Sequence, residues 1–110
     1  MFKESEFVKI QVGVQIEAAN AVREAMGTAG AGTQGNYFHC SFSSRGIGRF
    51  IQGMGAKPAI GAINKPEEVE EEMIETICHK DFVKKVILAV KKVHPYEEPA
   101  IDIIPRMDIM

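Results

Sequence analysis

The chain has 110 residues, of which 45% are hydrophobic, and a formal net charge of −2, values typical of one globular domain spanning residues 1–110. This mildly acidic balance gives no sign of a nucleic-acid partner. The sequence has neither a signal-peptide pattern nor an apolar run of membrane-spanning length. We therefore expect a soluble cytoplasmic protein without nucleic-acid or membrane partners. In that reducing compartment Cys40 and Cys78 are expected as buried thiols.

Hydrophobic periodicity predicts the first two elements. Clean alternation predicts a half-buried strand from Phe7 to Ile16. Its inward face would carry Val8, Ile10, Val12, Val14 and Ile16. Apolar residues then recur at three- and four-residue spacing, which predicts an amphipathic helix from Ala18 to Ala29. Gly27 or Gly30 can end this helix.

A hairpin is predicted after the helix. Alternation returns from Asn36 to Ser43, which indicates a second strand. Asn36, Phe38, Cys40 and Phe42 would point toward the core, and Tyr37, His39, Ser41 and Ser43 toward the open face of the sheet. Arg45-Gly46 is a plausible turn, and Gly46 to Gln52 would be the return strand.

The middle of the chain is less regular. The segment from Gly53 to Pro66 shows no hydrophobic periodicity and is long for a loop. We therefore expect it to close over a ligand or a neighbouring subunit. Glu67 to Glu72 alone could be helical, whereas Met73 to Cys78 contains strand-forming residues. Two choices of inward face stay open, one with Ile74, Thr76 and Cys78 and the other with Met73 and Ile77.

The last third predicts a helix and a strand. Phe82 to Val93 carries a clear apolar stripe, and Ile101 with Ile103 supplies a short final strand. Residues 1–6 and the tail from Met107 to Met110 are expected to be loosely held. The element order is therefore β-α-β-β-loop-β-α-β, with two helices on one face of an antiparallel sheet. This predicts an α+β fold, a ferredoxin-like βαββαβ sandwich with an extra hairpin or loop arm.

The corner between the second helix and the last strand carries the main candidate site. Pro95 should end the helix at His94, and Pro99 restricts the chain again before the strand. Tyr96 and Glu97 lie between these prolines. The corner is either a rigid connection with the tyrosine packed beneath it, or a small acidic and imidazole site for a cation or polar ligand.

Local metal chelation, nucleophilic catalysis and phosphate binding have less support from the sequence. His39 and Cys40 are neighbours on a predicted strand, so they point to opposite faces and cannot chelate one ion locally. The sequence contains no CxxC, HExxH or GxSxG pattern, and the glycine-rich run from Gly30 to Gly35 follows a helix instead of opening one. The lack of these motifs gives little support to nucleophilic catalysis, and a non-enzymatic role is favoured over an enzymatic one. The candidate ligand-binding residues are Tyr37, His39, His94, Tyr96 and Glu97, of which His94, Glu97 and His39 are candidate ligands for zinc or copper.

Three stretches resemble a known family. His94 to Glu97, HPYE, resembles the signature of the CutA family, and the longer run from His94 to Pro105 is similar to the end of the PII/CutA-like domain inserted into YqfO/YbgI proteins. Those are the NGG1-interacting-factor-like proteins. Gly30 to Ser43, and Gly46 to Phe50 with Gly53 to Gly61, also match that domain. The resemblance covers roughly Val8 to Pro105.

The resemblance implies the same ferredoxin-like fold in a stand-alone PII/CutA-like domain. It also implies a homotrimer joined through its sheets, with ligand sites at the clefts between subunits. The longer relatives hold two metals with ligands from segments that flank this domain, and these segments are not expected here. Our first hypothesis is thus a non-enzymatic regulatory module that senses a small ligand or divalent cation. The alternatives are a CutA-like copper-tolerance protein and a metal-dependent hydrolase acting at a subunit cleft.

Overall fold

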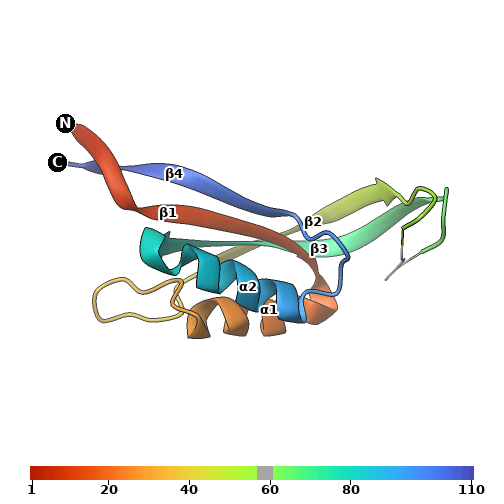
Figure 1. Cartoon of the computed structure of the whole chain (residues 1–110), viewed down its shortest axis with the longest axis horizontal. Coiled ribbons are helices and arrows are strands. Elements are labelled where there is room, and N and C mark those ends of the chain that lie inside the picture. Colours follow the sequence, from red (N-terminus) through yellow and green to blue (C-terminus); the bar gives the residue numbers. More distant parts are fainter. Residues whose placement is uncertain (57–60) are drawn as a thin grey trace.

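An antiparallel sheet with two helices on one face forms the body of the protein in the computed structural model, which describes residues 1–56 and 61–110 (Figure 1). The elements are β1 (Phe2–Gln15), α1 (Ile16–Thr28), β2 (Phe42–Ile51), β3 (Pro66–His79), a 3-10 turn (Lys80–Phe82), α2 (Val83–Val93) and β4 (Ile101–Ile109). The strand order is β2-β3-β1-β4, and every pair is antiparallel. This is the predicted ferredoxin-like βαββαβ arrangement, so the predicted fold class is confirmed.

The core lies between the sheet and the helices. The predicted alternation on β1 is confirmed, because its inward side chains from Val8 to Val14 are buried. They pack against apolar side chains of both helices and of β3, namely Ala19, Val22, Met26, Val86, Val90, Ile74 and Cys78. Burial of each large side chain in this set contributes about 1.5–3 kcal/mol. Both predicted helices are confirmed to within two residues at each end.

The predicted hairpin between residues 36 and 52 is wrong. One strand, β2, runs straight through Arg45-Gly46 and pairs with β3 over its whole length. Before it, glycines with positive φ turn the chain into a loop, in which Gln34 and Tyr37 exchange backbone hydrogen bonds of 2.9 Å. The aromatic side chains expected in the core, Phe38 and Phe42, are 70% and 67% exposed. Cys40 is only partly buried, whereas Cys78 is buried as predicted.

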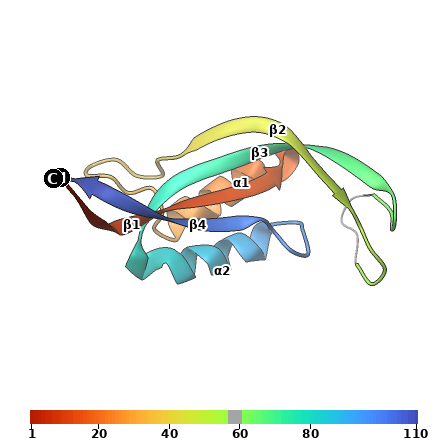
Figure 2. The same ribbon diagram turned by 90° about the horizontal axis from the view of Figure 1, so that it is seen from above.

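The acidic run is extended and not helical. Glu67 to Glu72 belongs to β3, which pairs with β2 on one side and with β1 on the other. Ile74, Thr76 and Cys78 face the helices, so the first of the two open alternatives is correct. Pairing with β2 satisfies one side of this backbone, and β1 pairs with the other side from Glu71 onward, which outweighs the weak strand propensity of glutamate. The β2–β3 arm extends beyond the helical layer, and the expected loop from Gly53 to Pro66 lies at its end (Figure 2). Residues 57–60 of that loop lie outside the described residues.

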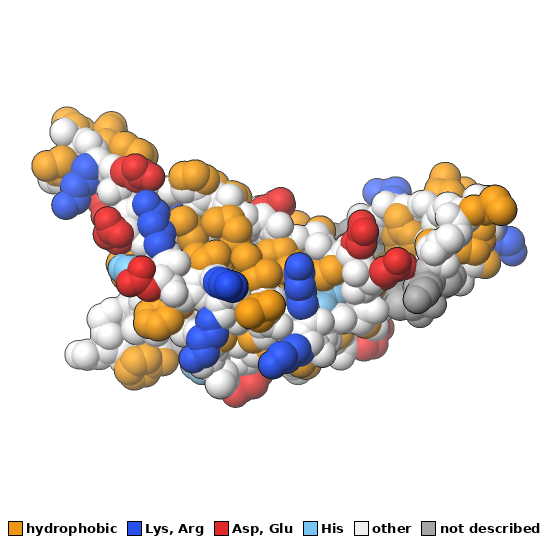
Figure 3. Space-filling model, viewed as in Figure 1, with side chains coloured by type: hydrophobic (Ala, Val, Ile, Leu, Met, Phe, Trp, Pro, Cys, Tyr) orange, Lys and Arg blue, Asp and Glu red, His pale blue; other side chains and the backbone are white. Residues whose placement is uncertain are grey.

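The two termini are paired, which corrects the prediction that they are loosely held. Phe2 faces Ile109 and Glu4 faces Met107 in the β1–β4 ladder, and the Met110 N–H donates to the Met1 carbonyl at 2.8 Å. This ribbon projects from the body, and apolar side chains gather at its tip (Figure 3). None of the helices in residues 1–56 and 61–110 is both long and apolar enough to cross a membrane.

Candidate functional site

His94 fixes the corner after α2. It leaves the helical conformation at φ −76° and ψ 129°, as expected before Pro95. Its imidazole is buried at 7% exposure, with Nδ1 accepting from the Tyr96 N–H at 3.1 Å and Nε2 lying 2.8 Å from the Gly13 carbonyl oxygen. Because Nδ1 accepts, Nε2 must carry the proton and donate to that carbonyl. Nε2 therefore holds the corner against β1, Nδ1 fixes the turn to Tyr96, and metal ligation by His94 would require breaking one of these bonds.

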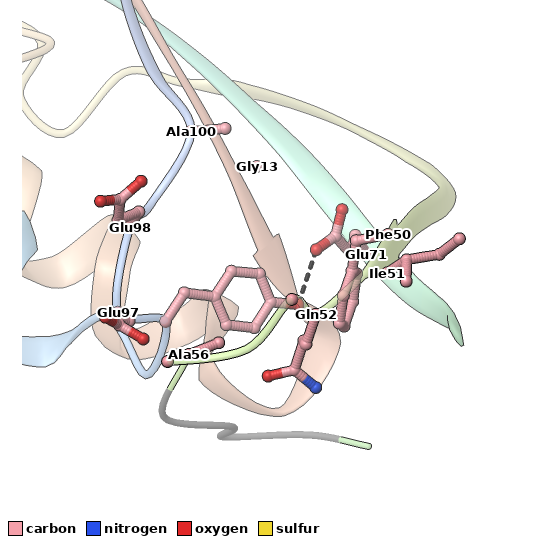
Figure 4. A pocket seen from close by; sticks show the side chains of 12 residues that line it. Gly13, Phe50, Ile51, Gln52, Ala56, Glu71, Glu97, Glu98 and Ala100 are labelled. Carbon is pink, nitrogen blue, oxygen red and sulfur yellow. Dashed lines mark hydrogen bonds between the residues drawn. The ribbon is translucent and has the colours of Figure 1, made fainter. Parts of the chain in front are cut away.

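Tyr96 connects the corner to β3. Its hydroxyl donates to Glu71 Oε2 at 2.6 Å, across the end of the open sheet face (Figure 4). The Glu71 carboxylate lies above Gly48 of β2, where an added Cβ would collide with it. Glycine at this β2 position therefore leaves the space that the carboxylate occupies.

The surroundings keep the Tyr96 phenol protonated. Burial raises its pKa above the usual value of about 10, and the hydrogen bond to Glu71 and the charges of Glu71 and Glu17 raise that pKa further. The hydroxyl is therefore a permanent donor at neutral pH.

This raised pKa can be measured by absorbance. In the Tyr37→Phe variant, Tyr96 is the only tyrosine left, and its phenolate band should appear at a pH well above 10. Adding Glu71→Gln removes the nearby negative charge, so the same band should then appear at lower pH. Ionisation near pH 10 in both variants would contradict the Tyr96–Glu71 contact.

A pocket of about 540 Å³ opens beside this pair. Its walls come from β1 at Gly13, from the end of β2 and the residues that follow it, from Glu71, and from the corner. Figure 4 shows Glu71 on one side of the pocket and Glu97 on the other, with Ala56 below. A volume of several hundred cubic ångströms is typical of small-molecule sites, roughly 300–1,000 Å³.

The predicted site residues divide between the two ends of the helical layer. Tyr96 and Glu97 line the pocket, and His94 supports it. Tyr37 and His39 lie instead on the loop after α1, at the opposite end of the helices. His39 covers Gly27, with Nδ1 3.9 Å from Glu24 Oε2.

One chain does not bring the three candidate metal ligands together. Within residues 1–56 and 61–110, no group of three or more His, Cys, Asp or Glu side chains is placed to hold a metal ion. A metal site that uses both His94 and His39 would need a second copy of the chain. Metal binding by these residues therefore stays a prediction.

Sequence reasoning missed most of the lining residues of the pocket, among them Glu71 and Phe50. Glu71 fell in a segment with no decided secondary structure, and Phe50 in the predicted return strand from Gly46 to Gln52, which carried no predicted site residue. Alternate glycines at 46 and 48 were an available signal, because side chains absent from one face of a strand leave room for a neighbouring group.

The fold defines the class of protein. The chain superposes on the divalent cation tolerance protein CutA from Archaeoglobus fulgidus with a TM-score of 0.66 at 18% identity, over 91% of this chain and 83% of CutA. It superposes on the GlnK–ATP complex of Bacillus subtilis with a TM-score of 0.61 at 14% identity, over 91% of this chain and 81% of GlnK. The fold is therefore that of the CutA- and PII-like ferredoxin-type domains.

Sequence similarity then identifies longer homologues of the chain. The chain is 50% identical over 97 residues to the GTP cyclohydrolase 1 type 2 homolog of Bacillus subtilis, covering 88% of this chain and 26% of that protein. A Bacillus cereus protein related to NIF3 superposes with a TM-score of 0.79 at 42% identity, over 96% of this chain and 26% of that one. No protein-family model matches the chain. The chain is thus homologous to part of these NIF3-related proteins and spans 26% of the Bacillus subtilis relative's length.

Proposed function

We propose that the chain is a non-enzymatic regulatory module that binds a small ligand in the pocket beside Tyr96. The pocket carries this proposal, because it is bounded by the rigid corner on one side and by the residues after β2 on the other. Its rigid side is held by the hydrogen bonds of His94 to Gly13 and of Tyr96 to Glu71. A ligand that contacts both the corner and the residues after β2 would hold the start of that loop in one conformation. A partner protein that binds this conformation would then respond to the ligand.

The alternatives have less support from the described residues. Copper or zinc binding and metal-dependent hydrolysis need several convergent ligands, and the part of the chain that the structure describes has no group of three in one copy. The relatives' name includes GTP cyclohydrolase, but the matched segment is 26% of the Bacillus subtilis protein. We therefore do not propose that activity for this chain.

A ligand screen tests the binding function. Melting temperatures of the chain would be recorded with a mixed library of anionic, cationic and neutral metabolites, since a ligand that binds the folded state raises its stability. A true pocket ligand should lose its effect in Ala100→Leu, which fills the pocket wall while leaving the backbone bond from Gly13 to residue 100 intact. Ala21→Leu makes the same change on an exposed position of α1 and is the matched control. If no compound of any charge acts through the pocket, the proposal fails.

We also propose that three copies associate through the open face of the sheet. The helices leave this face uncovered, and it exposes Phe42, Met73 and Ile104 at 67%, 39% and 38%. Alternation in the paired strands places these side chains on the same face as Gln11 and Glu75. Association would bury apolar surface that otherwise faces water.

Light scattering at micromolar concentration should give three times the mass of one chain. Met73→Glu places a charge on the proposed interface and should yield monomers. Leu88→Glu makes a similar change on the outer face of α2, where Leu88 is 53% exposed, and should leave the trimer intact. If the wild-type protein is a monomer, the trimer proposal fails. The proposal of ligand binding in the pocket is independent of that result and is tested by the ligand screen.

A further inference from the structure

We infer that the ligand of this pocket is a small organic cation, an alkylammonium or guanidinium compound. This inference rests on the proposed binding function and adds the chemical class of the ligand. It follows from three properties of the pocket: the sign of its charge, its aromatic lining and its size.

Among the described residues that line the pocket, the charged side chains are acidic. Among its described lining residues, Glu71, Glu97 and Glu98 carry carboxylates, and none is a lysine, arginine or histidine. Glu71 is held in place by Tyr96 and lies above Gly48, so its charge is fixed at the pocket wall. A concave site with this lining attracts cations and disfavours phosphates and carboxylates.

The remaining described lining is mainly aromatic and aliphatic, with the amide of Gln52 and three glycines beside it. Phe50 and Tyr96 bring aromatic rings to the pocket, and Ile51, Ala56 and Ala100 add apolar surface. An aromatic ring attracts a cation placed over its face, while apolar walls accept the carbon atoms of an organic ligand. Carboxylate and aromatic groups together therefore match an ammonium or guanidinium group that carries a carbon chain.

Size and donor number favour an organic cation over a metal ion. The pocket has a volume of about 540 Å³, far more than one ion needs. A hard divalent cation requires about six oxygen ligands at short distance. The described part of the chain holds no cluster of three or more His, Cys, Asp or Glu side chains placed for an ion.

Calorimetry on the full chain with defined probes tests this inference. Choline and agmatine supply an alkylammonium and a guanidinium group, 3,3-dimethyl-1-butanol is a neutral analogue of choline with the same shape, and ATP is an anionic probe. We expect at least one of the cations to bind and the neutral analogue to bind about tenfold more weakly than choline. Raising the salt concentration should weaken binding of the cations.

Variants locate the binding. Glu71→Gln keeps the shape of the side chain and removes its charge, so affinity for the cations should fall about tenfold. Phe50→Leu removes the aromatic face and should lower the affinity for choline several-fold. Glu70→Gln is the matched control, because it makes the same charge change one residue away, on the opposite face of β3, and should leave affinity unchanged. Unfolding midpoints of all three variants verify that they are folded.

The outcomes separate the two proposals. If ATP or a neutral compound binds in the pocket and the cations do not, the inference of a cationic ligand is wrong. The proposed regulatory function is then retained. Equal affinity of wild type, Glu71→Gln and Phe50→Leu for the cations places binding elsewhere and also overturns the inference of a cationic ligand. No pocket-dependent binding by any probe or library compound removes both proposals.

Discussion

Replacing Gly32 by alanine should lower the free energy of unfolding by about 3 kcal/mol or more, because two separate penalties coincide there. Gly32 has a φ of +81°, a conformation that side chains disfavour. An added Cβ would also collide with the carbonyl oxygen of Cys40 and lie 2.7 Å from its nitrogen. These are backbone atoms, held by the hydrogen bonds of Cys40 to Gly32 and of Thr76 to Cys40, so they cannot swing aside. Urea unfolding measures the effect.

Gly35→Ala is the matched control for this prediction. Gly35 also has a positive φ, of +58°, but an added Cβ meets nothing within 4 Å. Only the conformational penalty applies there, which is about 1 kcal/mol. Equal losses for the two variants would show that the Cys40 backbone is not packed against Gly32.

Removing the His94 imidazole should cost about 3 kcal/mol of unfolding free energy. In His94→Ala the Gly13 carbonyl and the Tyr96 N–H each lose a hydrogen-bond partner, and the 7% exposure of the ring means that truncation also leaves a void. Because His94 holds Tyr96 in place, ligand binding in the pocket should weaken as well.

His39→Asn is the matched control. The His39 side chain is 45% exposed and the residue has a φ of +58°, a conformation that asparagine tolerates. The expected change in unfolding free energy is within about 0.5 kcal/mol. A loss for His94→Ala no larger than that of this control would mean that the corner is not anchored through the imidazole.

The sequence by itself determined β1 from Phe7 onward, both helices and the corner. In each case the signal is local: alternation on β1 and three- and four-residue spacing on the helices report which side chains face the core. Pro95 likewise acts on its own neighbour, since it excludes His94 from the helix whatever the rest of the chain does. The order of these elements then predicts the ferredoxin-like class, because few topologies place two helices on one face of such a sheet.

Only the tertiary structure decided the rest, because it depends on partners distant in the chain. Alternation from Asn36 to Ser43 looked like a strand, yet the glycines before it allow a loop, and β3 pairs only from Phe42 onward. The acidic start of β3 is extended because β2 pairs with all of it and β1 joins from Glu71 onward. The pocket depends on a hydrogen bond between Glu71 and Tyr96, 25 residues apart in sequence, which no local pattern encodes.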